Sequence, residues 1–278
     1  MIREWIGSAD SCLNQNQIKK KRICFFSHYD RDGKIDDYVL YYLKCLKECG
    51  LDLIFITTSD QELDEEIKRV LPYCVLAIQR KNITLDFGSW RIAWDRATHL
   101  LEMKMHYNQL VLANDSVYGP FFSLPQIFSE MELKNLDFWG MSSSEEITDH
   151  LQSYFLVFEQ KVFHSQTFEK FWTNFIFYRR KSTIIRKYEI GLSRLAIAED
   201  WRRGAWFQIE SESKFDVNPT LFSWDDLIQR HKFPFLKTEV LRLNRARSKN
   251  VNCWEKIVSK SSEYPISLIK NHVTRVRQ

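Results

Sequence analysis

The sequence lacks the short motifs that identify several large classes of nucleotide-binding protein. No GxGxxG follows a predicted strand and no GxxxxGK[ST] occurs, so neither a dinucleotide-binding fold nor a phosphate-loop NTPase is supported. The six cysteines form no CxxC pair and do not cluster with histidine, which argues against a zinc or redox centre. No apolar run approaches the roughly 18 residues that a membrane-spanning helix needs.

The sequence also has no internal repeat, low-complexity linker or signal peptide. Its positive and negative charges are nearly balanced. The 40 Lys and Arg residues exceed the 36 Asp and Glu residues by only four, and they are spread along the chain. This diffuse charge argues against a nucleic-acid partner but suits an anionic small ligand or an anionic membrane surface. We therefore expect a reduced cytoplasmic protein, with peripheral contact at the inner face of the membrane as one option.

What is present is an ordinary globular composition, with 44% hydrophobic and 27% charged residues. One stretch concentrates polar chemistry at the end of an apolar segment. Residues 110–113 read as a buried strand, and Asn114-Asp115-Ser116 follow directly, before a Gly119-Pro120 turn. In open α/β sheets, ligands bind at this carboxyl edge. Asp115 then offers a hard oxygen ligand for Mg²⁺ or Mn²⁺, whereas an Asx-turn at Asn114 or Asp115 is the competing structural interpretation.

Strands and helices alternate through the first half of the chain. Strands are expected at residues 23–27, 53–58, 73–78 and 110–113, with helices at 35–49, 61–70 and 90–105 between them. This alternation predicts an α/β fold with a parallel, doubly wound sheet. Residues 1 to about 20 read as a polar helical lead-in.

The alternation loosens after Pro120. We expect a helix at 121–131, strands at 137–141 and 150–158, an aromatic-rich helix at 163–178, a helix at about 188–203, and helical pieces in 215–243. A basic segment follows. The predicted organisation is one domain at residues 1–244 and a basic, helical C-terminal extension at 245–278, which we expect to rest on membrane, to be solvated or to contact a second copy.

Seven motifs occur together in a fixed order. They are His28-Tyr29-Asp30, Asp86-Phe87-Gly88-Ser89-Trp90, residues 112–120, Asp137-Phe138-Trp139-Gly140, residues 150–158, Tyr188-Glu189-Ile190-Gly191-Leu192 and Phe233-Pro234-Phe235-Leu236-Lys237. In this combination the chain resembles the rhamnan synthesis F family of bacterial polysaccharide glycosyltransferases. The resemblance implies a GT-A-like (Rossmann-like) fold, with a mostly parallel sheet flanked by helices, and an inverting transfer of L-rhamnose from dTDP-L-rhamnose to a lipid-linked or oligosaccharide acceptor.

The same resemblance suggests roles for residues of the first half. His28, Tyr29, Asp30 and Asp86 would face the nucleotide-sugar donor, and Asn114-Asp115-Ser116 would stand where GT-A enzymes have a DXD metal motif. Asn114 departs from that motif because it replaces one carboxylate. A divalent metal, Mg²⁺ or Mn²⁺, would then have Asp115 as its strong ligand, and metal-independent catalysis remains open.

Candidates for proton transfer and phosphate binding come from the second half and from the helix after Asp86. Glu189, expected to open a helix, resembles the acidic residue that serves as general base in inverting GT-A enzymes, and His150 is the reserve base. Lys237 and Arg91 are candidate phosphate contacts, and His231 is a candidate metal ligand. Three of these residues also have a plainer interpretation. Glu189 would only complement a helix dipole, Arg91 would form a salt bridge on a helix face, and His231 would be a turn residue.

The expected function is therefore a glycosyltransferase that adds a deoxyhexose to a cell-surface polysaccharide. Two rivals stay open. In the first, the same fold uses a UDP- or GDP-sugar. In the second, the chain is a non-catalytic glycan- or nucleotide-binding module of an assembly complex, an alternative that the Asn in place of Asp at position 114 supports.

Overall fold

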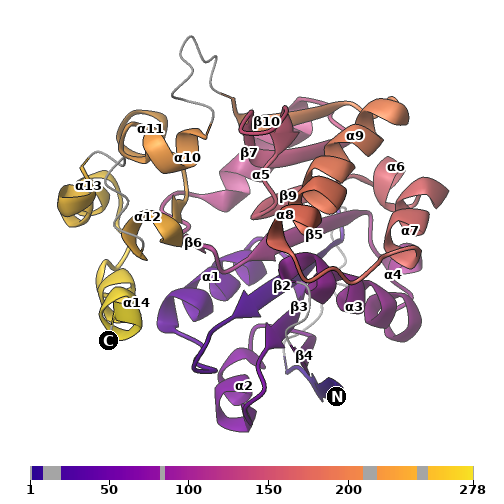
Figure 1. The fold of residues 1–278 in the computed structure, drawn as a ribbon, viewed down its shortest axis with the longest axis horizontal. Coiled ribbons are helices and arrows are strands. Elements are labelled where there is room, and N and C mark those ends of the chain that lie inside the picture. Colours follow the sequence, from indigo (N-terminus) through magenta and orange to yellow (C-terminus); the bar gives the residue numbers. More distant parts are fainter. Residues whose placement is uncertain (1, 9–19, 82–84, 209–217, 243–249, 278) are drawn as a thin grey trace.

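A mixed β-sheet forms the centre of the molecule, and helices cover both of its faces (Figure 1). The computed structural model describes residues 2–8, 20–81, 85–208, 218–242 and 250–277. Within these residues the large sheet has nine strands in the order β1-β4-β3-β2-β5-β9-β7-β10, with β8 paired to β7. The predicted class, α/β with a largely parallel sheet flanked by helices, is confirmed.

The elements follow the chain in this order. The strands of the large sheet are β1 Ile2–Ile6, β2 Arg22–Tyr29, β3 Leu51–Thr58, β4 Leu76–Arg80, β5 Gln109–Asn114, β7 Phe138–Ser144, β8 His150–Leu151, β9 Phe155–Phe158 and β10 Arg203–Phe207. A small second sheet pairs β6 Val117–Tyr118 with β11 Leu236–Lys237. The helices of the first half are α1 Asp37–Glu48, α2 Asp64–Val70, α3 Leu85–Leu100, α4 Met103–His106 and α5 Leu124–Leu133. Those of the second half are α6 Gln160–Phe163, α7 Gln166–Thr173, α8 Lys181–Ile184, a π-helical turn Ile185–Glu189, α9 Ile190–Ala198, α10 Pro219–Phe222, α11 Trp224–His231, α12 Thr238–Arg242, a 3₁₀ turn Val251–Cys253, α13 Trp254–Ser261 and α14 Ser267–Arg277.

Strands β4, β3, β2 and β5 are parallel neighbours and form the buried core of the sheet. Successive residues of a strand point to opposite faces, so their apolar runs serve two separate cores. On β2, for example, Phe26 belongs to the core that includes residues of α1, α5 and α11 to α14, whereas Phe25 belongs to the core that includes residues of α3, α4, α6 and α7. This arrangement explains why these strands read as continuous hydrophobic runs.

Antiparallel pairing begins beyond β5. Strand β9 lies between β5 and β7 and runs antiparallel to both, and β10 then pairs parallel with β7. The single strand predicted at residues 150–158 is therefore two strands, β8 and β9. The short turn around Gln152 and Ser153 separates them. The helix predicted to end near residue 203 ends at Ala198, and residues 203–207 form β10, because the edge of β7 offers backbone partners that local helix propensity does not anticipate.

Two further helical predictions are wrong. Residues 2–6 form strand β1, which pairs antiparallel with β4 in the register Ile2 to Arg80, instead of beginning a helix; residues 9–19 of that lead-in lie outside the described part. The helix expected at 163–178 is interrupted, since α6 ends at Phe163 and Ser165 caps the new helix α7 by accepting a hydrogen bond from the Phe168 amide.

The segment that carries Glu189 is also different from expectation. Helical conformation starts at Lys181, passes through the π-helical turn Ile185–Glu189 and continues as α9 to Ala198. Glu189 thus lies within a helical run and not at its N-terminus. The predicted benefit of a helix N-terminus for the Glu189 carboxylate does not apply.

The C-terminal helices pack on the domain. Helix α14 contacts α1 and α12, and α13 contacts α11; both lie beside α12 at one side of the molecule, opposite α6 and α7 (Figure 1). The predicted boundary at residue 244 falls in 243–249, outside the described residues. Among the helices that the structure describes, none has both the length and the apolar character to cross a bilayer.

Gly119 fixes the connection between β6 and the segment before β11. It has a φ of +132° and precedes Pro120 in a cis peptide bond. A Cβ atom at this position would lie 2.3 Å from the carbonyl oxygen of Pro234. The close approach of these two chain segments therefore requires glycine.

Candidate functional site

A cavity of about 250 Å³ opens at the carboxyl ends of the parallel strands β2, β3 and β5. Residues 27–30 of β2, Thr58 of β3, and Asp115 and Ser116 after β5 line it. Asp86 comes from α3, and the opposite wall comes from the C-terminal third of the chain, where α12 and α14 supply Thr238, Arg242, His272 and Val276. The cavity thus occupies the sheet edge at which the sequence places its polar residues.

Asp115 is fixed from three directions. Its carboxylate Oδ2 accepts a hydrogen bond from the Tyr29 amide at 3.1 Å, its backbone amide donates to Ser27, and its carbonyl accepts from the Tyr38 hydroxyl at 3.1 Å. The carboxylate is only 14% exposed. Burial, together with the nearby charge of Asp86, raises the pKa of Asp115 well above its ordinary value. The protein thus fixes the position of the Asp115 carboxylate but supplies little positive charge to stabilise its ionised form.

The sequence left two interpretations open for Asn114 and Asp115, an Asx-turn and a ligand-binding carboxylate. Each residue fits one of them. Asn114 forms the Asx-turn, because its Oδ1 accepts from the backbone amide and the hydroxyl of Ser116. Its Nδ2 also donates to Asp86 Oδ2 at 3.0 Å. Asp115 instead reaches across to β2. The amide at position 114 therefore links the end of β5 to the Asp86 carboxylate, and only the carboxylate of residue 115 faces the cavity.

Asp86 is placed by the start of α3. The buried guanidinium of Arg80 at the end of β4 donates to the Ser89 hydroxyl and to the Leu85 carbonyl, which ties this first helical turn to the sheet. Burial raises the pKa of Asp86, although Ser27, Arg80 and Asn114 all act to lower it. Asp86 and Asp115 form a pair of desolvated carboxyl groups at one end of the cavity.

His28 lies beside this pair. The ring is 2% exposed, its Nδ1 hydrogen-bonds with the Thr57 hydroxyl at 2.9 Å, and its Nε2 lies 3.8 Å from Asp115 Oδ2. Burial lowers the pKa of His28 to about 4, so the ring is neutral at neutral pH. A neutral imidazole beside a carboxylate can act as a hydrogen-bond partner or as a metal ligand.

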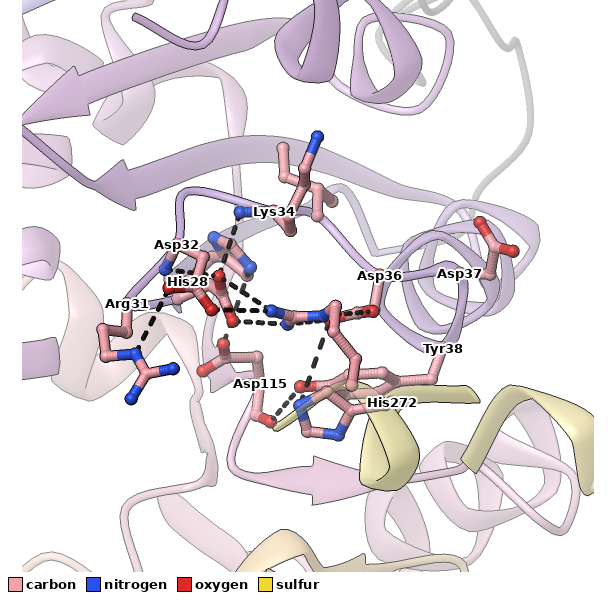
Figure 2. Close-up of polar contacts among 12 residues, drawn as sticks. His28, Arg31, Asp32, Lys34, Asp36, Asp37, Tyr38, Asp115 and His272 are labelled. Atoms are coloured by element: carbon pink, nitrogen blue, oxygen red, sulfur yellow. Dashed lines mark hydrogen bonds and ion pairs between the residues drawn. The ribbon is translucent and has the colours of Figure 1, made fainter. Parts of the chain in front are cut away.

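The other end of the cavity holds three carboxylates that share one guanidinium. Arg275 of α14 forms ion pairs with Asp30, Asp32 and Asp36 in the loop between β2 and α1, and Figure 2 shows this cluster next to Asp115. Burial opposes ionisation of Asp30, but the hydrogen bond from Arg275 holds its pKa below the ordinary value. Arg275 therefore pairs with Asp30 and Asp36 and offsets part of their charge, whereas Asp86 and Asp115 have no comparable ion-pair partner in the described residues.

His272 joins α14 to the same wall. Its ring is 4% exposed, and its Nδ1 lies 2.7 Å from the Tyr118 hydroxyl. Its Nε2 faces Asp36 at 3.9 Å (Figure 2). Burial lowers the pKa of His272 to about 4, so this second imidazole is also neutral at neutral pH.

Glu189 and Lys237 form a separate group outside the cavity lining. Glu189 Oε1 accepts from the Ser153 amide at 2.8 Å, and the Lys237 ammonium lies 5.6 Å from the centre of the Tyr154 ring. Burial lowers the pKa of Lys237, and the charge of Glu189 opposes this shift. The charge of Glu189 also acts on Asp86. Lys237 is followed in the chain by Thr238, which lines the cavity, so this group borders the cavity on the side of β9 and β11.

Besides Glu189, Lys237 and Asn114, three predicted site residues do not line the cavity. Arg91 pairs with Asp95 one turn further along α3, which is the helix-face salt bridge considered above. His231 ends α11, is 45% exposed and lies 3.6 Å from Asp226. His150 is buried at the start of β8, where its Nδ1 donates to the Thr148 carbonyl at 2.7 Å. The histidines that do line the cavity are His28 and His272.

The cavity lining fits a divalent cation. It carries five carboxylates, those of Asp30, Asp32, Asp36, Asp86 and Asp115, against the guanidinium groups of Arg31 and Arg242. Asp30, Asp36 and His272 bring ligand atoms within 4.8 Å of one another, but Arg275 already compensates these two carboxylates. Asp86 and Asp115 form no ion pair with a Lys or Arg of the described residues, and neutral His28 lies beside Asp115. Carboxylate oxygens and imidazole nitrogen suit Mg²⁺ or Mn²⁺.

Comparison with known proteins identifies the family. The sequence profile of rhamnan synthesis protein F matches residues 53–278, which is most of the chain but begins after residues 27–38 of the cavity lining. The chain belongs to the rhamnan synthesis protein F family. Among curated relatives of this family member, the protein y4gN of Sinorhizobium fredii is 31% identical over 194 residues, 68% of this chain and 49% of the relative. The virulence protein VirA of Vibrio anguillarum is 26% identical over 254 residues, 81% of each chain. The chain thus spans about half the length of the first relative.

Solved structures that resemble this rhamnan synthesis protein F family member have low sequence identity to it. The glycosyltransferase GlyE of Streptococcus pneumoniae is 14% identical, with a TM-score of 0.45, over 93% of this chain and 64% of that one. A cytidylyltransferase of Leptospira borgpetersenii is 12% identical, with a TM-score of 0.41, over 89% and 99% of the two chains.

Several residues of the site were not anticipated from the sequence. They are Tyr38, Asp36, Arg242, His272 and Arg275. Asp36 had a local signal, since Asp30, Asp32 and Asp36 follow a strand within seven residues. His272 and Arg275 had none, because the contact of Arg275 with Asp30 joins residues 245 positions apart.

Proposed function

We propose that the protein is a glycosyltransferase that transfers L-rhamnose from dTDP-L-rhamnose, with inversion, to a lipid-linked or oligosaccharide acceptor in polysaccharide assembly. Membership of the rhamnan synthesis protein F family supports the sugar and the process. The observation that carries the proposal is the cavity at the carboxyl ends of β2, β3 and β5, where burial raises the pKa of Asp115 and of Asp86 and no Lys or Arg of the described residues forms an ion pair with either.

The proposed donor site uses residues from two strand ends and one helix. His28, Tyr29, Asp30 and Asp86 would line the nucleotide-sugar site, and Asn114 would hold Asp86 in position through its 3.0 Å hydrogen bond. A diphosphate is strongly anionic, and it would be repelled by the five carboxylates of the lining. A bound Mg²⁺ or Mn²⁺ supplies the neutralising charge for the departing diphosphate, and Asp115 is its proposed ligand.

Proton removal from the acceptor hydroxyl is assigned to Glu189. The Ser153 amide donates a hydrogen bond to its carboxylate, and its charge acts on both Asp86 and Lys237, which supports a role beside the proposed donor site. His150 remains the alternative base, but its burial and its hydrogen bond to Thr148 leave it less accessible to an acceptor. The Lys237 ammonium is proposed to contact a donor phosphate, where a buried cation has most effect.

Turnover with a panel of dTDP-, UDP- and GDP-sugars, with and without Mn²⁺, tests the proposal. Nucleotide release and ligand-induced thermal shift are measured for the wild type and for Glu189→Gln, with Glu199→Gln as the matched control because Glu199 follows the same helix and is exposed. We expect dTDP-L-rhamnose to stabilise all three proteins and Glu189→Gln to lose turnover by about 100-fold or more.

The possible outcomes separate the rivals. Stabilisation by a UDP- or GDP-sugar alone would assign a different donor to the same site. Donor binding by the wild type without nucleotide release, in the presence of candidate acceptors, would favour the non-catalytic binding module. A protein that no donor stabilises at millimolar concentration would refute the donor site at Asp115.

A further inference from the structure

One surface segment combines exposed apolar side chains with unpaired positive charge. It comprises residues 174–187, from the end of α7 through a loop into α8 and the π-helical turn. The segment contains five basic residues and no acidic residue. The basic residues, all exposed, are Arg179, Arg180, Lys181, Arg186 and Lys187. Its net charge of +5 exceeds the +4 of the whole chain, so positive charge is concentrated here.

These five basic side chains are free. In the part of the chain that the structure describes, none of them forms an ion pair or a side-chain hydrogen bond, whereas basic residues elsewhere are often paired, as Arg69 is with Asp37 and Glu66. The absence of local acids leaves their field uncompensated. Such a cluster attracts an anionic surface within about one Debye length, roughly 10 Å at 0.1 M salt.

Two large apolar side chains project from the same segment. Ile176 is 58% exposed and Phe177 is 47% exposed. The loop that carries them is anchored, because the Tyr188 hydroxyl accepts a hydrogen bond from the Ile176 amide and donates one to the Ile176 carbonyl. Phe175 stacks on Tyr188 with ring centres 4.2 Å apart. The backbone is therefore held from within, while Ile176 and Phe177 stay about half exposed, with the Phe177 ring edge-on to Phe175 at 5.1 Å between ring centres.

We infer that residues 174–187 form the surface through which the protein docks onto an anionic lipid membrane. Ile176 and Phe177 would enter the boundary between headgroups and acyl chains, and the five cations would contact the lipid phosphates. A nucleic acid would satisfy the cations but would leave the aliphatic Ile176 side chain without a partner, so a lipid surface fits both features better.

The C-terminal segment, expected from the sequence to approach the membrane, fits this role less well. Arg275 is bound to the carboxylates of the cavity, Arg277 donates to the Leu241 carbonyl and Lys270 pairs with Glu255. These cations already have partners inside the protein. Lys256 and Lys260 of α13 are exposed, but α13 has no exposed large apolar side chain beside them.

Docking through residues 174–187 would also orient the proposed site. Lys181 lies close enough to Lys237 for its charge to lower the pKa of the Lys237 ammonium, and Glu189 continues the same helical run. The membrane would then lie on the side of the molecule where Glu189 is proposed to meet the acceptor. This orientation rests on the proposed function, whereas membrane docking itself does not.

Vesicle co-sedimentation tests the inference without any donor or acceptor. The full chain is mixed with phosphatidylcholine vesicles that contain no anionic lipid or about one-third phosphatidylglycerol, at low and high salt. Two variants alter the segment: Arg179→Gln/Arg180→Gln and Ile176→Ser/Phe177→Ser. Two matched controls lie elsewhere: Lys256→Gln/Lys260→Gln for exposed charge and Leu133→Ser, whose leucine is 87% exposed, for exposed apolar area.

We expect the wild type to bind the anionic vesicles in preference to the neutral ones. Loss of two arginines should lower the partition coefficient about 25-fold, at roughly fivefold for each charge near the surface. Loss of the two apolar side chains should lower it about tenfold or more, including at high salt, where the charge contribution is screened. Both controls should bind as the wild type does, and circular dichroism should confirm that all variants are folded.

Three results would overturn the inference. The wild type could fail to bind anionic vesicles, or the Lys256→Gln/Lys260→Gln control could lose binding as strongly as the arginine variant. Third, Ile176→Ser/Phe177→Ser could bind vesicles unchanged while a DNA duplex binds equally tightly, which would indicate a general polyanion site. Nucleotide release by the segment variants, measured without vesicles, should equal that of the wild type, so failure of docking is distinguishable from failure of the proposed transferase.

Discussion

Replacing Asp115 with Asn should make the ligand-free protein more stable while it removes the response to metal and donor. The buried Asp115 carboxylate has a raised pKa, which means that its ionised form is less favourable in the folded protein than in the unfolded chain. Asparagine removes the charge, and its side-chain oxygen can still accept the hydrogen bond from the Tyr29 amide. Relief of such functional-site strain typically contributes about 0.5–2 kcal/mol.

The raised pKa of Asp115 determines how the stability of the folded protein changes with pH. Below the unfolded pKa of an aspartate, near 4, the carboxyl group is protonated in both states, and its ionisation does not affect stability. As the pH rises from there through the raised folded pKa, the wild type loses stability, because the folded state holds the proton that the unfolded state has released. The gap between Asp115→Asn and the wild type should therefore widen between acidic and neutral pH and then level off.

Thermal denaturation across this pH range measures the effect. At about 2–4 °C per kcal/mol for a chain of this size, the variant should melt roughly 1–8 °C above the wild type at neutral pH. Asp149→Asn is the control, since Asp149 is 54% exposed and its pairing with Arg203 contributes little. Asp115→Ala, which leaves the Tyr29 amide without its acceptor, should be less stable than Asp115→Asn by about 1–3 kcal/mol. A melting temperature of Asp115→Asn below that of the wild type at neutral pH would refute the assignment of an uncompensated charge.

Two further substitutions test how the cavity is built. Arg275→Gln should destabilise the protein by about 2 kcal/mol at neutral pH, because it leaves Asp30 and Asp36 unpaired in a mostly buried cluster. The pKa of Asp30 is lowered despite burial, so this stabilisation exists above the unfolded pKa near 4 and disappears on acidification; a difference in melting temperature that persists at pH 2 to 3 would contradict it. Gly119→Ala should cost more than about 2 kcal/mol, because the new methyl group would meet the Pro234 carbonyl at a φ of +132°. Gly50→Ala is its control: Gly50 also has positive φ but no neighbour within 4 Å, so chemical denaturation should report a smaller loss, of about 1 kcal/mol, and an equal loss would point to backbone strain alone.

The parts of the fold that depend on local sequence could be predicted well. The run at residues 110–113 is apolar on both faces and ends in small polar residues, so the strand, its burial and the position of Asp115 at its carboxyl end followed from the pattern alone. The place of Asp86 at the start of a helix also followed from the local sequence, whereas its role at the donor site was implied only by the family resemblance. These features are decided within a few residues, where hydrophobic periodicity is informative.

What depends on long-range contacts was not predictable. Strand β1 is short and mixes apolar and charged residues on both faces, and it is a strand because β4 offers it a free edge. The helical run from Lys181 to Ala198 includes Thr183, Ile184 and Ile185, whose β-branched side chains give no clear helix signal, so its start was placed too late. The partners of Asp30 and Asp36 were missed for the same reason, since no local pattern indicates a guanidinium that arrives from α14.

The ion pair between Asp30 and Arg275 also has a consequence for the order of folding. The two residues are 245 positions apart, so the contact closes a loop that contains nearly every strand of the sheet. Contacts of such long range form only after the intervening chain has been ordered, because their closure costs the most entropy. During synthesis, β2, β3 and β5 can pair on the ribosome before α14 exists. We therefore expect the sheet to be assembled first and the wall that α14 contributes to close last, so that a nascent chain carries a folded core with an open, strongly acidic edge until residue 275 has emerged.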